Sequence, residues 1–92
     1  MSDLLKKFEN AAKEIYSEKK DVRECVYCAY VDHLSDINLD DLPEDVQMIY
    51  EAVTDRLTSP ERPGDISNDE AQYLAIDILY IADVVRSHLK EL

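Results

Sequence analysis

Two cysteines and two histidines are the side chains of this sequence best suited to metal binding or redox chemistry. Cys25 and Cys28 stand three positions apart, and His33 and His88 are the remaining candidate ligands. Structural zinc sites use two ligand pairs at defined spacing on turns, and redox dithiols belong to a strand–turn–helix unit. The two cysteines fall within a helical pattern that offers neither context. We therefore interpret them as packing residues of a reduced protein and expect no metal site.

A second pattern resembles the start of a calcium-binding loop. Asp36, Asn38 and Asp40 occupy the spacing of its positions one, three and five between two predicted helices. Position six requires glycine for a sharp turn, and position twelve requires a bidentate glutamate. Here those positions hold Asp41 and Gln47. The sequence therefore predicts no EF-hand.

General acid–base chemistry is the third candidate. His33 directly follows Asp32, but neighbouring residues on an α-helix do not face each other, so the two are not expected to act as a dyad. The sequence also lacks the Glu-x-x-His pairs of di-metal bundles, a nucleophile elbow and a phosphate-binding glycine loop. We expect no catalytic residue and no cofactor, and an enzyme is the least favoured class.

The elements that would position these residues are all helices. Glycine occurs once and proline three times in 92 residues, and apolar residues recur at helical spacing between these breakers. Helices are predicted at about 3–19, 22–35, 42–57 and 68–90. A chain of this length is expected to form one domain, residues 1–92. The predicted fold is all-α, a small four-helix bundle.

The last predicted helix carries apolar residues on two opposite faces. It begins with a capping box formed by Ser67 and Glu70. Its inner stripe comprises Ala71, Leu74, Ala75, Ile78, Ile81, Ala82, Val85 and Leu89; its outer stripe comprises Tyr73, Ile76, Tyr80 and Val84. Helices of a small bundle normally bury one stripe each. The outer stripe is thus expected to contact another molecule, unless the loop over residues 35–42 covers it.

The charge is strongly negative, with 21 acidic against 10 basic residues and a net charge of −11. Such a chain repels nucleic-acid phosphates and anionic lipids, so no direct contact with nucleic acid or membrane is expected. An acidic patch is predicted before and within the start of the third helix: Asp36, Asp40, Asp41, Glu44 and Asp45. It would suit a basic protein partner. Alternatively, these carboxylates form a solvated surface and favour the adjacent helix dipole.

Two functional hypotheses follow. The preferred one is a non-enzymatic protein–protein interaction module that forms a homodimer through the outer stripe. The alternative is an acidic inhibitor of a basic nuclease or DNA-binding protein. Bacteriocin immunity proteins, antitoxins and phage DNA mimics are similar to the chain in size and acidity, although no motif is shared. The N-terminus has no apolar run of signal-peptide length, so a cytoplasmic location is expected.

Overall fold

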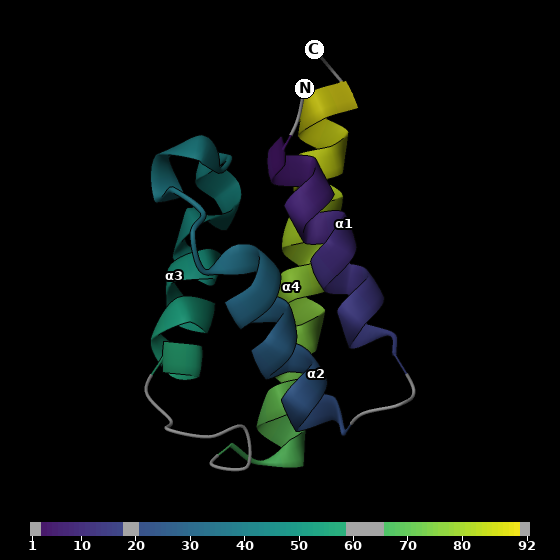
Figure 1. Ribbon diagram of the computed structural model, residues 1–92. Helices are drawn as coiled ribbons and strands as arrows, with labels where there is room; N and C mark the ends of the chain where they lie inside the picture. The colour runs from purple at the N-terminus through teal and green to yellow at the C-terminus, as the bar shows by residue number, and fades with distance from the viewer. Residues whose placement is uncertain (1–2, 18–20, 59–65, 91–92) are drawn as a thin grey trace.

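Four α-helices build the fold in the part of the chain that the structure describes, residues 3–17, 21–58 and 66–90. In this computed structural model they are α1 (Asp3–Ile15), α2 (Val22–Ala29), α3 (Glu44–Thr58) and α4 (Asn68–Lys90) (Figure 1). A π-helical turn, η1 (Tyr30–Leu34), continues α2, and a 3-10 turn, η2 (Leu39–Asp41), precedes α3. The predicted all-α four-helix bundle is confirmed. None of the helices searched is both long and apolar enough to cross a bilayer.

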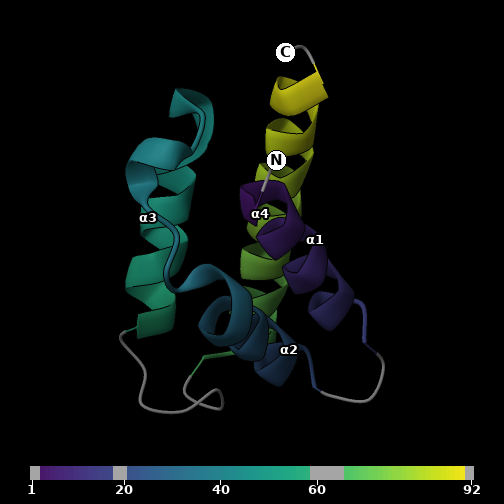
Figure 2. The same ribbon diagram turned by 45° about the horizontal axis from the view of Figure 1, so that its top comes forward.

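The helix α4 is the centre of the bundle. It contacts α1, α2 and α3, and Figures 1 and 2 show α1 and α2 crossing in front of it while α3 runs alongside. Its inner stripe is buried from Ala71 to Val85, and Ile78 and Ile81 have no exposed surface. Leu89, the last predicted member, lies outside the described side chains. The other helices pack Phe8, Val26, Val46 and other apolar residues against this stripe.

Two of the helices begin at polar caps that the sequence shows. The side chain of Asp21 accepts a hydrogen bond from the backbone N–H of Arg23 at 3.0 Å, and Ser67 Oγ accepts one from the N–H of Glu70 at 3.1 Å. These bonds satisfy N–H groups that lack partners in the first helical turn. The carboxylate of Glu70 pairs with the Arg56 guanidinium, so it links α3 to α4. This hydrogen-bonded pair lowers the pKa of Glu70.

The ends of two helices differ from the prediction. The first helix was expected to reach residue 19, but α1 ends at Ile15 and Tyr16 lies in a turn, with 70% of its surface exposed; residues 18 and 19 lie outside the described residues. The N–H of Ser17 donates to the carbonyl of Glu14 at 3.2 Å, a tighter turn than an α-helix makes. The third helix begins at Glu44 rather than at residue 42. Leu42 is extended because it precedes Pro43, whose ring disfavours helical backbone at the residue before it.

The second helix was predicted as one α-helix over 22–35, but it changes to a π-helical turn at Tyr30. Tyr30 and Leu34 are buried in this turn, as Val26 and Ala29 are in α2, so the turn extends the buried face of the helix. The hydroxyl of Tyr50, on α3, donates a hydrogen bond of 2.5 Å to the carbonyl of Leu34. Burial, with a smaller contribution from Tyr30, raises the pKa of Tyr50 to about 12. This neutral phenol therefore ties α3 to the end of η1.

Two isoleucines two residues apart on α4 test which face of this helix supports the fold. Ile78 is fully buried, whereas 61% of the surface of Ile76 is exposed. Ile78→Ala should lower the free energy of unfolding by about 2–5 kcal/mol, because it leaves a cavity in the core. Ile76→Ala should change it by no more than about 0.5 kcal/mol in dilute solution. Urea unfolding of both variants measures this, and similar losses would contradict the assigned faces.

The buried phenol predicts a loss of stability at alkaline pH. The ordinary pKa of a tyrosine is 10.0, whereas burial raises the pKa of Tyr50 in the fold to about 12. The unfolded chain thus loses this proton first. The contribution is fully present below pH 10 and is lost as the pH rises toward 12, by up to about 1.4 kcal/mol per pH unit.

Urea unfolding between pH 9 and 12 measures this slope. The interval begins about one unit below the pKa of the unfolded phenol and ends at about the pKa of Tyr50 in the fold. Tyr50→Phe should flatten it and should cost about 1 kcal/mol at neutral pH through the lost hydrogen bond. Tyr16→Phe, at an exposed position, is the matched control. Equal slopes in the wild type and in Tyr50→Phe would show that Tyr50 does not carry the effect.

Candidate interaction surface

The outer stripe lies on the face of α4 that the other helices do not cover. Tyr73, Ile76 and Tyr80 are 71%, 61% and 50% exposed, whereas Val84 is half-buried and packs against the core. The loop over residues 35–42 therefore leaves the first three side chains accessible. Exposed apolar side chains on successive turns of one helix are a feature of binding surfaces.

Acidic groups border the outer stripe at both ends. Asp69 and Gln72 line a shallow cavity of about 260 Å³ with Tyr73 and Ile76. At the other end Val84 lies in a depression of about 270 Å³ together with Asp45, Asp83, Ser87 and His88. Asp45 belongs to the start of α3, so the outer stripe and the acidic patch meet in this depression.

Asp77 lies on α4 between the two ends of the outer stripe. Its side chain is half-buried. Burial raises the pKa of Asp77, because a carboxylate partly removed from water is less favourably ionised. Further loss of water around Asp77 would disfavour its ionised form more strongly.

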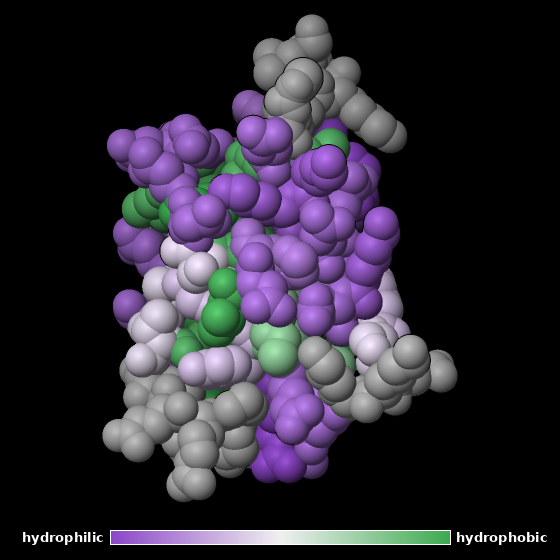
Figure 3. Space-filling view, in the orientation of Figure 1, coloured by the Kyte–Doolittle hydropathy of each residue, from purple (hydrophilic) through white to green (hydrophobic). Residues whose placement is uncertain are grey.

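All five residues of the acidic patch are exposed. The carboxylate of Asp36 pairs with Lys7 Nζ at 3.1 Å, and this hydrogen-bonded pair lowers the pKa of Asp36. Among the described residues, the other four form no ion pair. In Figure 3, hydrophilic residues gather at the upper left of the surface. Figure 1, in the same orientation, shows η2 and the start of α3 at this place.

The other candidate residues make local contacts. The side-chain oxygen of Asn38 accepts from the N–H of Asp40 at 3.2 Å and so caps η2. Both cysteines are free thiols; Cys25 is buried and its Sγ donates to the carbonyl of Ser17 at 3.5 Å, while Cys28 is half-buried. His88 is exposed in the depression beside Val84.

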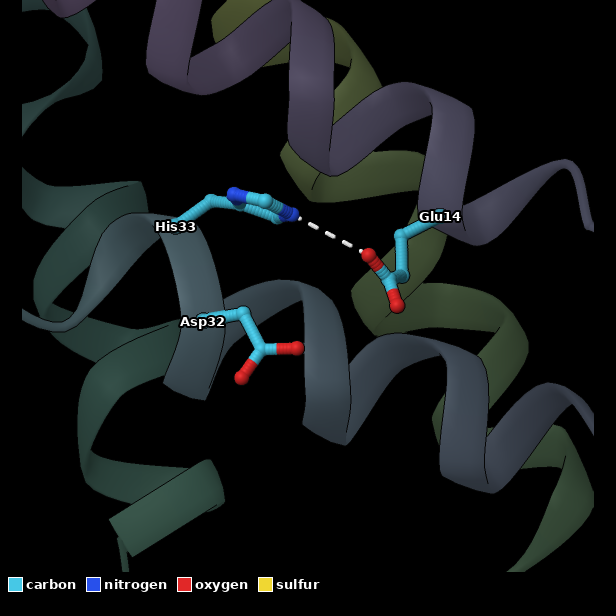
Figure 4. A group of neighbouring side chains, drawn as sticks. All are labelled: Glu14, Asp32 and His33. Atoms are coloured by element: carbon cyan, nitrogen blue, oxygen red, sulfur yellow. Dashed lines mark hydrogen bonds and ion pairs between the residues drawn. The ribbon is translucent and has the colours of Figure 1, made fainter.

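One group of polar side chains was missed in the sequence. His33 Nε2 lies 3.0 Å from Glu14 Oε2, and a carboxylate oxygen of Asp32 completes a cluster whose three potential ligand atoms are within 4.8 Å of one another (Figure 4). Asp32 and His33 were not expected to act as a dyad, and no contact of either residue with Glu14 was predicted. Both residues lie in the turn η1, which packs beside α1, and this packing places them near Glu14. The sequence carries no local signal for this contact between residues 14 and 33.

Comparisons with known proteins assign no function to this arrangement. No protein-family model, no curated protein and no solved structure matches the chain. A functional assignment must therefore come from the chemistry and exposure of the surfaces described above.

Proposed function

We propose that the chain is a non-enzymatic protein–protein interaction module that self-associates through the outer stripe of α4. The observation that supports this most directly is the exposure of Tyr73, Ile76 and Tyr80 on a helix whose opposite face lies at the centre of the core. Tyrosine is enriched in interfaces because it combines a large apolar area with a polar tip. Removing these three side chains from water would favour association.

A second copy is the partner that this stripe fits. Homodimers commonly use a two-fold axis, so that the same patch contacts itself. With the axis between Ile76 and Tyr80 and the two α4 helices antiparallel, Tyr73 would oppose Val84 of the second copy. Asp69, at the start of one helix, would then approach His88 near the end of the other. Antiparallel helices also bring the positive end of each dipole near the negative end of the other.

Asp77 is the residue that opposes this pairing. It lies close to the proposed axis, so the two copies would bring two carboxylates together in a drier environment, which costs free energy. Ionisation of Asp77 should therefore weaken the dimer, and a neutral side chain of the same shape should strengthen it.

Sedimentation equilibrium over a concentration series tests the dimer. The mass of the wild type should rise from one chain toward two. Tyr80→Glu should weaken association at least about tenfold, because it introduces a charge into the contact, and Asp77→Asn should strengthen it. Met48→Glu is the matched control, since Met48 is 80% exposed on α3 outside the stripe.

Two outcomes would reject this proposal. A wild type that remains one chain at every concentration would remove the homodimer. Loss of helical circular dichroism in Tyr80→Glu would show that the outer stripe belongs to the core.

The acidic patch supports a second candidate function, inhibition of a basic nuclease or DNA-binding protein. Its basis is the exposure of Asp40, Asp41, Glu44 and Asp45 without intramolecular ion pairs among the described residues. Binding of this kind would weaken steeply with added salt, whereas an apolar dimer would be insensitive or tighten. Measuring association with a basic nuclease from 50 to 500 mM salt, a range over which the screening length falls from roughly 14 to 4 Å, separates the two.

We also propose a cytoplasmic location. The free thiols Cys25 and Cys28 fit a reducing compartment, where disulfides are rare. The acidic surface does not favour attraction to anionic lipid.

A further inference from the structure

We infer that Glu14, Asp32 and His33 form a binding site for a divalent transition-metal ion, with Zn²⁺ as the ion that fits the donors best. The cluster joins two carboxylates and one imidazole from two elements, the last turn of α1 and the π-helical turn η1 (Figure 4). This inference is independent of the self-association proposed for α4.

The separations of the donor atoms suit a single ion. Donors that bind the same Zn²⁺ at about 2.0–2.2 Å lie roughly 3–3.5 Å apart. His33 Nε2 and Glu14 Oε2 are 3.0 Å apart, close to that spacing. The oxygen of Asp32 is within 4.8 Å of both. Asp32 is exposed, so rotation of its side chain can complete the set without moving the backbone.

The chemistry of the donors selects the class of metal. Ca²⁺ and Mg²⁺ prefer all-oxygen ligands, whereas imidazole together with carboxylates suits first-row transition ions, Zn²⁺ among them. Three protein ligands leave one position of a tetrahedral ion for water. Two carboxylates balance the charge of the ion, and the net charge of −11 raises the local concentration of cations.

The packing of the cluster distinguishes it from a surface ion pair. The side chains of His33 and Glu14 are only 26% and 23% exposed. Neighbouring atoms therefore restrict the movement of both side chains. Leu34 and the hydrogen bond from Tyr50 hold the end of η1 in the core. Asp32 places a second carboxylate within 4.8 Å of this pair. A bound cation would be shared by both carboxylates and the imidazole.

Isothermal titration of the metal-stripped 92-residue chain with ZnCl₂ tests the site. One ion should bind per chain, and the ring NMR signals of His33 should shift while those of His88 stay in place. His33→Gln and Glu14→Gln should each weaken binding at least about tenfold, since even outer-shell changes cost that much at metal sites. Asp32→Asn should also weaken Zn²⁺ binding. Because Asp32 is exposed, this substitution should leave the stability of the fold unchanged.

Two control variants exclude other ligands. His88→Gln removes the second imidazole and Cys28→Ser removes the more accessible thiol, and both should bind Zn²⁺ as the wild type does. Binding that persists unchanged in Asp32→Asn and His33→Gln, or that is lost in Cys28→Ser, would overturn the assignment. Absence of binding to the wild type would leave the cluster as an ion pair only.

Discussion

Burial of the inner stripe of α4 is the constraint on which the rest of the structure depends. The sides of this helix toward α1, α2 and α3 hold small and branched apolar residues, from Ala71 to Val85. The alanines let neighbouring helices approach closely, and the isoleucines fill the space between them. α1, α2 and α3 therefore all pack against this one helix. α2 contributes only eight residues before it changes to the π-helical turn.

This central role leaves α4 with an outer face that the fold does not use. The three neighbours occupy the side of the inner stripe, so Tyr73, Ile76 and Tyr80 remain in water. Exposed apolar area of this kind carries a risk of aggregation, and acidic residues reduce it. Asp69, Asp77 and Asp83 lie on or beside that face. These three aspartates would also limit which molecules can bind to the outer stripe. A partner with an acidic surface could bind only in an orientation that keeps its carboxylates away from theirs.

Much of the fold could be predicted because its signals are local. The caps at Asp21 and Ser67 and the two faces of α4 depend on residues within a few positions of one another. The π-helical turn could not be predicted in this way. Its conformation depends on burial of Tyr30 and Leu34 and on the distant Tyr50, none of which helical periodicity records. The boundary at Glu44 also has a local cause, since Pro43 disfavours helical backbone at Leu42.

The candidate surfaces differ in how far the sequence alone could predict them. The outer stripe lies on one regular α-helix, so its members share a face whatever the rest of the chain does. The cluster of Glu14, Asp32 and His33 requires the last turn of α1 to pack beside η1, a contact between distant parts of the sequence that no local pattern records. In η1 the buried Leu34 and the hydrogen bond from Tyr50 hold the turn in the core. At the edge of the same turn, His33 and Asp32 lie within reach of Glu14.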